Sequence, residues 1–329
     1  MLSRSVCESL QFDKREPAAG GRTGALGRAA ARVIVAQVLG ATLLLWDGQR
    51  FRDAAVTKRV RSAPDLGSSL VAVGDRVQTE EVGDGTLRVV GIEPRTSFLG
   101  RVARGSHDRI QVLAANAAQA IIVSAAAEPP FRPGLVDRFA LLALRGGMTP
   151  VLCLNKVDLV SREEAARLVG ETCLPLDAVF VSASSGAGLD GLRERLAGHA
   201  SVLVGHSGVG KSYLLKRLFP AEEILTGALS SKSGKGRHTT ASARLYVLPE
   251  GGHVIDTPGV RMVPLGTVRA AEVAELFPAI HAAPPCRFRP CSHRAEPGCS
   301  VRTGVGAGTI TEQVYARYRR LLAVVEEEC

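Results

Sequence analysis

Residues 205–212 read GHSGVGKS and fit the pattern G-x-x-x-x-G-K-[ST]. An apolar run at 201–204 precedes them and a helical pattern opens at Lys211, which is the strand-to-helix context that the motif requires. The N–H groups of such a loop face phosphate oxygens, and the helix N-terminus adds positive charge. A chance glycine-rich turn is the alternative, and the flanking strand and helix argue against it. The sequence predicts a nucleotide-binding loop formed by Gly205, His206, Ser207, Gly208, Val209, Gly210, Lys211, Ser212 and Tyr213.

A second motif indicates which base is bound. Residues 155–158 read NKVD and directly follow an apolar strand at 151–154. Guanine presents two N–H donors on one edge, and a single carboxylate can accept both, whereas adenine offers no such pair. NKVD alone is also compatible with an exposed turn, but residues 182–183 follow the next strand and resemble the loop that contacts guanine through its backbone. We predict that the base is bound by Asn155, Lys156, Val157, Asp158, Ser182 and Ala183.

A third motif, DTPG at 256–259, follows the apolar run 253–255. This pattern places a carboxylate near Mg²⁺ and a backbone N–H near the γ-phosphate. The segment 230–240 is rich in Ser, Gly and Lys without an apolar period, and we interpret it as a mobile first switch. Lys211 is expected to reach the β- and γ-phosphates. The predicted Mg²⁺ ligands are Ser212, Thr240 and Asp256, and Gly259 completes the predicted GTP-binding set.

The residue that orients the attacking water is not the usual one. Ras-like GTPases carry a glutamine after D-x-x-G, but this chain has Val260, which cannot orient water. His238 lies in the predicted first switch and can accept a proton or a hydrogen bond near neutral pH. We predict that His238 positions the water and that Thr240 joins it as a catalytic residue. The alternative is that His238 is a solvated loop histidine.

The order of these motifs is itself informative. In most GTPases the phosphate-binding loop comes first and the base-reading motif comes late. Here the base-reading motif at 155–158 precedes the phosphate loop at 205–212, and the second switch at 256–259 comes last. The same sheet can be kept if the termini are moved to another loop, which folds usually tolerate. The sequence therefore predicts a circularly permuted GTPase whose second switch leads directly into the C-terminal segment.

The pattern along the chain predicts four segments. Residues 1–29 have no apolar period and are expected to form a flexible tail. Residues 30–112 contain about five short strands separated by turn signals, which favours a small β-barrel such as an OB-fold. Residues 113–266 alternate apolar strands with helices and predict a mostly parallel α/β sheet covered by helices on both faces. Residues 267–329 hold helices around a cysteine- and histidine-rich stretch and predict an α-helical metal-binding domain.

Four metal-ligand side chains occur within fourteen residues of this last segment, in the spacing C-x₄-C-x-H-x₅-C. Three thiolates and one imidazole match a closed structural Zn²⁺ site, which leaves no open position for a catalytic water. Several prolines surround the ligands and leave little room for a hydrophobic core, so the metal is expected to stabilise the local fold. Unrelated cysteines are the alternative. We predict one Zn²⁺ per chain, bound by Cys286, Cys291, His293 and Cys299.

Charge and the remaining composition indicate partner and compartment. The net charge is +9 and the pI about 9.5, which suits a polyanionic partner such as RNA, although an arginine-rich proteome would have the same composition. The most apolar run, 33–46, is too short and too interrupted to cross a bilayer. Arginines and serines near the N-terminus are typical of a transit peptide, but Glu8, Asp13 and Glu16 argue against one. We expect a cytoplasmic monomer without a membrane partner.

The motifs together resemble the RsgA (YjeQ) family of circularly permuted GTPases, which act in maturation of the small ribosomal subunit. The resemblance covers residues 30 to about 325 and rests on NKVD, GHSGVGKS, DTPGV, the GRHTT stretch at 236–240 and the cysteine–histidine run at 286–299. It implies an OB-fold, a permuted GTPase core and a zinc domain, with binding to the 30S subunit and its 16S rRNA. It also implies catalytic and switch roles for His238 and Thr240. Two residues depart from the family pattern, Ala118 and Ala241, and neither is a predicted ligand.

The sequence thus favours a GTP hydrolase that assists 30S maturation, binds rRNA and is released when GTP is hydrolysed. A non-catalytic RNA-binding assembly factor that uses GTP as a structural ligand is the main alternative, and Val260 keeps it open. A signalling GTPase without RNA is a third possibility. The basic barrel loops and the arginines around the metal ligands count against it.

Overall fold

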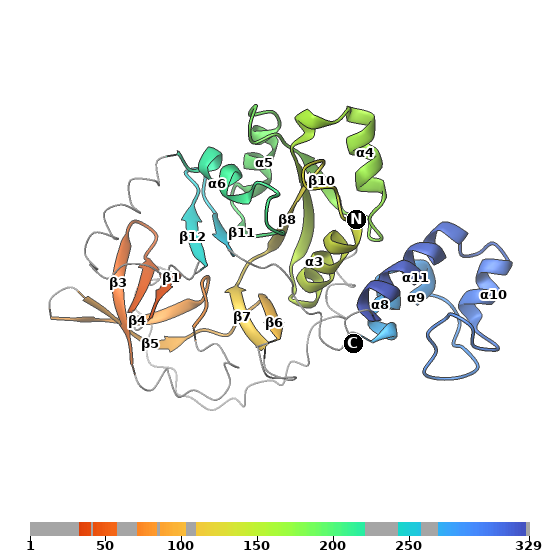
Figure 1. The fold of residues 1–329 in the computed structure, drawn as a ribbon. Helices are drawn as coiled ribbons and strands as arrows, with labels where there is room; N and C mark the ends of the chain where they lie inside the picture. Colours follow the sequence, from red (N-terminus) through yellow and green to blue (C-terminus); the bar gives the residue numbers. More distant parts are fainter. Residues whose placement is uncertain are drawn as a thin grey trace.

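The structure is a computed structural model that describes residues 33–40, 42–57, 71–83, 86–102, 110–220, 243–257 and 269–326. The tail predicted at 1–29 lies outside this part of the chain. The central feature of the structure is a sheet that begins with five neighbouring strands, all parallel to one another (Figure 1). In spatial order these strands are β10 (Asp177–Phe180), β9 (Thr149–Asn155), β8 (Gln119–Ala125), β11 (Ala200–Val204) and β13 (His253–Asp256).

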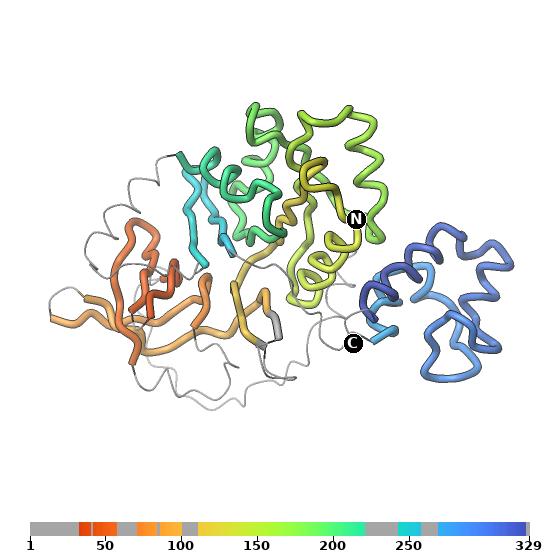
Figure 2. The backbone as a smooth tube through the Cα atoms, viewed as in Figure 1, coloured from red at the N-terminus to blue at the C-terminus, as the bar shows by residue number. Residues whose placement is uncertain are grey.

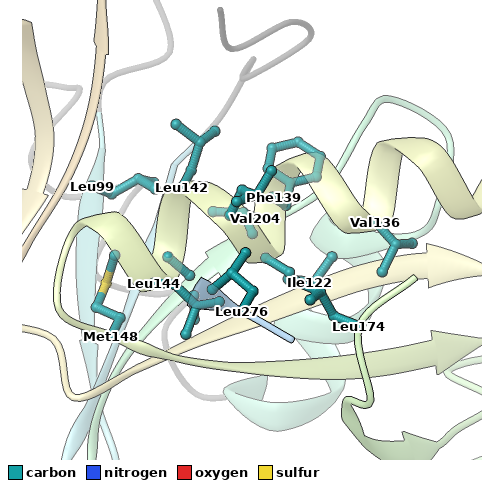
Figure 3. Packing of buried hydrophobic residues seen from close by; sticks show 14 of the residues in the cluster. Leu99, Ile122, Val136, Phe139, Leu142, Leu144, Met148, Leu174, Val204 and Leu276 are labelled. Atoms are coloured by element: carbon teal, nitrogen blue, oxygen red, sulfur yellow. The ribbon is translucent and has the colours of Figure 1, made fainter. Parts of the chain in front are cut away.

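Helices cover both faces of this sheet, as the alternating sequence pattern predicts. Successive strand residues point to opposite faces. Ile122, Leu152 and Val204 belong to the same buried cluster as α3 (Pro133–Arg145), whereas the neighbouring positions Ile121 and Val151 pack on the other side. Figure 3 shows α3 against Ile122 and Val204. The second face is covered by α5 (Leu189–Leu196) and α6 (Lys211–Leu218), and α4 (Arg162–Gly170) follows β9 with its own small cluster.

The N-terminal strands form the predicted small β-barrel, and the structure shows that it is closed. The strands pair in the order β1, β2, β3, β5, β4, and β1 pairs again with β4, so the sheet closes on itself. Val35, Leu45 and Val89 are completely buried in the cluster that fills the barrel. The bounds of the five strands are β1 (Val33–Leu39), β2 (Thr42–Trp46), β3 (Phe51–Val56), β4 (Arg76–Val82) and β5 (Thr86–Ile92).

Two features absent from the sequence-based prediction join the barrel to the parallel sheet. Strand β12 (Arg244–Val247) pairs antiparallel with β13 on one side and with β1 on the other, so eleven of the described strands form one continuous sheet. A hairpin of β6 (Phe98–Val102) and β7 (Ile110–Ala115) connects the barrel to β8. At the end of this hairpin the buried Asn116 accepts a hydrogen bond from the Thr96 N–H (2.9 Å) and donates one to the Gly74 carbonyl (3.0 Å).

The C-terminal residues form a small helical module beside α3, as the tube in Figure 2 shows. Its core is shared with the parallel-sheet domain, because Phe277 and Tyr318 belong to the same buried cluster as Phe139 of α3. The guanidinium of Arg320 also donates to the Glu171 carbonyl and to the Cys173 sulfur, which lie after α4. The helices of the module are α8 (Ala270–Glu275), α9 (Pro278–His281), α10 (Ser300–Gly306) and α11 (Glu312–Glu326).

None of the helices among these described residues is long and apolar enough to span a bilayer.

Candidate functional site

The parallel strands bring the predicted motifs to one edge of the sheet. The carboxyl ends of parallel strands meet at the same edge, where open α/β sheets bind their ligands. Asn155 ends β9, Gly205 follows β11, and Asp256 ends β13. Ser182 lies two residues beyond β10. Motifs that are about a hundred residues apart in the sequence therefore share a single edge.

The phosphate-binding loop, residues 205–212, has the backbone that its glycines allow. Gly205 has a φ of 140°, and a Cβ there would lie 2.2 Å from the Val123 carbonyl oxygen, so only glycine fits against β8. Gly210 has a φ of 95° and is the N-cap of α6. The backbone thus passes directly from β11 into the N-terminus of α6, where N–H groups can bind phosphate.

Lys211 and Asp256 are the principal charges below this loop. Burial lowers the pKa of Lys211, and the Asp256 carboxylate opposes that shift. Burial likewise raises the pKa of Asp256, and Lys211 opposes it. The ammonium of Lys211 donates to the carbonyls of Gly205 and His206, the latter at 2.9 Å. It therefore lies across the loop, at the position from which it can turn to a bound phosphate.

The residues around Asp256 fit a Mg²⁺ ion. Its Oδ1 atom is buried and has no hydrogen-bond partner among the described residues. A buried carboxylate oxygen without a donor is costly unless a cation binds it. Ser212 is exposed at the first turn of α6, and its hydroxyl is the second oxygen donor of the predicted set. The donors are hard oxygen ligands, which is the chemistry that Mg²⁺ prefers.

Asn155 joins the base-reading motif to the phosphate-binding loop. Its side chain is 1% exposed. Its amide nitrogen donates to the Val209 carbonyl (2.8 Å), and its amide oxygen accepts from the Ala183 N–H (3.0 Å). One side chain thus binds the loop at 182–183 and the loop at 205–212 at the same time. This bridge holds the two predicted halves of the nucleotide site beside each other.

The carboxylate of Asp158, which is predicted to read guanine, is exposed and ionised. Hydrogen bonds, chiefly from Ser182, lower the pKa of Asp158, and the Ser184 hydroxyl donates to its Oδ2 at 3.1 Å. The Ser182 and Ser184 hydroxyls are themselves 2.9 Å apart. Asp158 therefore presents two acceptor oxygens to solvent in the form that can receive two N–H groups. Ser184 was not among the residues predicted from the sequence, and a second serine after Ser182 was its only signal.

Lys156 and Val157 lie beside this carboxylate. Lys156 has a left-handed backbone (φ 62°), and its ammonium donates to the Glu128 carbonyl in the loop after β8. The Val157 N–H donates to the Val181 carbonyl (3.2 Å). These contacts fix the aliphatic stem of Lys156 near the site where the base is predicted to bind.

The other predicted loop residues occupy different positions. Tyr213 is 51% exposed on α6. The His206 ring lies with Nδ1 2.7 Å from the Ser207 carbonyl. The predicted catalytic residues His238 and Thr240, with Gly259 and Val260, lie outside the described residues, as does the whole first switch at 230–240.

The four predicted metal ligands converge in the C-terminal module. Their ligand atoms all lie within 4.8 Å of one another. The sulfur atoms of Cys286 and Cys299 are 3.9 Å apart, and the Nδ1 atom of His293 lies 3.5 Å and 3.4 Å from them. A tetrahedral ion with Zn–S bonds of about 2.3 Å would place sulfurs roughly 3.8 Å apart. The Cys₃His group therefore has the composition and spacing of a site that can hold a metal ion.

Three further residues hold this site in shape, and the sequence analysis did not identify them. The Glu296 carboxylate accepts hydrogen bonds from the Ser292 hydroxyl and from the N–H groups of Ser292 and Arg294, which lowers its pKa. From α11, Tyr315 donates to the His293 carbonyl (2.7 Å) and Tyr318 to the Ser292 carbonyl (2.9 Å). These contacts anchor the loop to the helix and orient the ligands.

The fold and the site together define a circularly permuted phosphate-loop nucleotide-binding protein with a barrel and a metal module. The family model for the RsgA GTPase matches residues 92–266. A protein of Gemmatimonas aurantiaca, named small ribosomal subunit biogenesis GTPase RsgA, is 39% identical over 83% of this chain and 90% of its own length. A protein of the same name in Chromohalobacter salexigens is 42% identical over 77% of this chain and 74% of its own length. The chain belongs to the RsgA GTPase family, as its motifs indicated.

Solved structures agree with this assignment. The crystal structure of YjeQ from Thermotoga maritima has a TM-score of 0.66 and 26% identity, and the match covers 90% of this chain and 98% of that one. The structure of YloQ, a circularly permuted GTPase, has a TM-score of 0.63 at 22% identity and supports the fold alone. The predicted fold class, a permuted GTPase core with a barrel and a metal-binding helical domain, is confirmed.

Proposed function

We propose that this GTPase assists late maturation of the small (30S) ribosomal subunit, binds its 16S rRNA and dissociates after GTP hydrolysis. The observation that supports the proposed GTP site is the Asn155 bridge, which joins the loops at 182–183 and 205–212 by two hydrogen bonds. Several relatives, 35–42% identical, are named small ribosomal subunit biogenesis GTPases, which supports the ribosomal role. The excess of basic residues suits rRNA as the partner.

In this proposal each residue has a definite task. Asp158 accepts the two guanine N–H groups while the stem of Lys156 lies along the base. The 205–212 backbone and Lys211 bind the phosphates. Ser212, Thr240 and Asp256 would hold Mg²⁺, which would supply positive charge that favours the transition state. His238 orients the attacking water and accepts a hydrogen bond from it.

The proposed metal of the C-terminal module is one structural Zn²⁺, since the four side chains would fill every position of a tetrahedral ion. The segments are an OB-fold at 30–112, the GTPase domain at 113–266 and the zinc-binding domain at 267–329. The protein works in the cytoplasm as a monomer, where its ribosomal partner is found.

The test is single-turnover phosphate release from GTP by the purified full chain, with and without 30S particles. The proposal expects 30S particles to accelerate release and His238→Ala to remove most of that acceleration while GTP affinity is kept. Unstimulated release in the wild type, together with no effect of His238→Ala, would instead indicate an assembly factor that holds GTP as a structural ligand. A salt-insensitive interaction with 30S would exclude direct binding to rRNA phosphates.

A further inference from the structure

An exposed aromatic residue stands at the tip of the metal-binding loop. Residues 287–290 lie between the ligands Cys286 and Cys291, and all four are exposed. Phe288 is 50% exposed, which is unusual for a large apolar side chain that could otherwise be buried. Among the described residues its ring has one partner, the Arg287 guanidinium, whose Cζ lies 5.3 Å from the ring centroid. The ring therefore keeps much of its surface open.

The tip carries positive charge that nothing in the described chain neutralises. Arg287 and Arg289 flank the ring, and within the described residues neither forms an ion pair with a carboxylate. The only acidic residue between the first and last cysteine is Glu296, whose carboxylate is occupied by the N–H groups of its own loop. Arg294 is paired with Glu326 at 2.6 Å. Arg287 and Arg289 thus remain available to an anionic partner.

The tip is held in place before any partner arrives. The Arg287 N–H donates to the Gly298 carbonyl at 3.1 Å, which closes the base of the loop. Gly298 lies so close to this segment that a Cβ there would come within 2.8 Å of the Arg287 Cβ. Since the ends of the tip are also fixed by Cys286 and Cys291, presenting the ring costs little conformational entropy on binding.

We propose that Phe288 is a stacking platform for an unpaired RNA base and that Arg287 and Arg289 contact the adjacent phosphates. A free aromatic face between two uncompensated cations is the arrangement by which proteins bind single-stranded nucleic acid, because every base offers a π-face and every linkage a phosphate. Duplex RNA would not fit, since its bases are already stacked. The inference deepens the proposed function, on which it rests for the presence of RNA.

The test uses tryptophan fluorescence in the full metal-loaded chain. Phe288→Trp places an indole at the tip, and the wild type, whose one tryptophan is Trp46, supplies the background signal. The proposal expects a short single-stranded RNA of mixed sequence to quench the new indole, and a blunt duplex of the same sequence to leave it unchanged. Phe180→Trp, at a 40% exposed phenylalanine on β10, is the matched control and is expected to remain unquenched.

Two binding measurements complete the test. Loss of one stacked base is expected to weaken RNA binding at this site about 5- to 150-fold in Phe288→Ala. In the Phe288→Trp background, with the Trp46 signal of the wild type subtracted, Arg289→Gln should reduce the slope of log affinity against log salt by about 0.7, the value for one phosphate contact on a single strand. Quenching by duplex RNA, or by ribosomal proteins but not RNA, would overturn the platform. These results do not depend on hydrolysis, so an RNA-quenched indole in a chain without 30S-stimulated activity would refute the proposed function alone.

Discussion

Asn155→Ala tests whether one buried side chain holds the nucleotide pocket together. The substitution removes both bridging hydrogen bonds and leaves the Val209 carbonyl and the Ala183 N–H without their partner. These two residues are 0% and 3% exposed. A buried polar group left unsatisfied costs about 1–3 kcal/mol, so two of them cost about 2–6 kcal/mol. We therefore expect Asn155→Ala to lower the free energy of unfolding by about 2–6 kcal/mol.

The nucleotide affinity should fall as well. Without the bridge, the nucleotide itself must bring the loops at 182–183 and 205–212 into register. If the loss of this preorganisation makes the binding free energy less favourable by the value of one hydrogen bond, about 1.4 kcal/mol, the Kd for GDP rises about ten-fold. Chemical denaturation of the nucleotide-free chain gives the first quantity, and titration with a fluorescent GDP analogue gives the second.

Asn116→Ala is the matched control. Asn116 is also a buried asparagine whose amide binds two backbone groups, the Thr96 N–H and the Gly74 carbonyl, but it lies at the junction with the barrel. The Asn116→Ala variant should lose about as much unfolding free energy as Asn155→Ala and should keep the wild-type affinity for GDP. Unchanged GDP binding in Asn155→Ala, or an equal loss of affinity in both variants, would refute the role of the bridge.

Three further outcomes are expected. Asp158→Asn should lower the affinity for GTP at least about 100-fold, because a charge-assisted pair of hydrogen bonds is lost. The same variant should gain affinity for xanthosine triphosphate, whose base offers one N–H and one carbonyl that an amide can match. If this exchange of specificity fails, the base binds elsewhere. Burial lowers the pKa of His253 to about 4, with Arg76 acting in the same direction. Since the pKa of His253 in the unfolded chain is about 6.5, its contribution to stability is fully present above pH 6.5 and is lost as the pH falls towards 4. Between pH 7.5 and 5 the free energy of unfolding should therefore fall by up to about 2 kcal/mol more in the wild type than in His253→Gln, as measured by chemical denaturation. Chelation of the metal should unfold residues 284–299, measured by protease cleavage there, while GDP affinity is unchanged.

The parts of the fold with local signals were predictable from the sequence. Helix α4 has its signals within its own sequence, because Ser161 caps it by accepting from the Glu164 N–H and because its apolar positions recur at helical spacing. The barrel strand at 86–92 is likewise bounded by turn signals. In both cases the information lies within a few residues of the element that it specifies.

The missed elements depend on distant partners. Strand β12 has four residues, of which only Leu245 is buried, so it has little amphipathic pattern of its own. It forms because β13 and β1 lie on either side, and its register partner Gln37 is more than two hundred residues away. Glu296 is similar at the metal site, since its role arises from N–H groups that only the folded loop brings together. The local sequence pattern does not specify these tertiary contacts, because the partners meet only in the folded chain.

The metal-binding module is attached to the GTPase core in two ways, by the chain connection after β13 and by the packing of α11 beside α3. The chain runs from Asp256 at the end of β13 into the module, while α11 packs in the same buried cluster as α3 and contacts Glu171 and Cys173. A module that shares a hydrophobic core with its neighbour does not rotate freely, because separating them exposes the apolar surface of residues such as Tyr318 and Leu322. Release of the γ-phosphate should therefore leave the module packed against α3. Movement of the whole module would require breaking the α3–α11 contact, so a cross-link between these helices that abolished dissociation from 30S particles would refute this expectation.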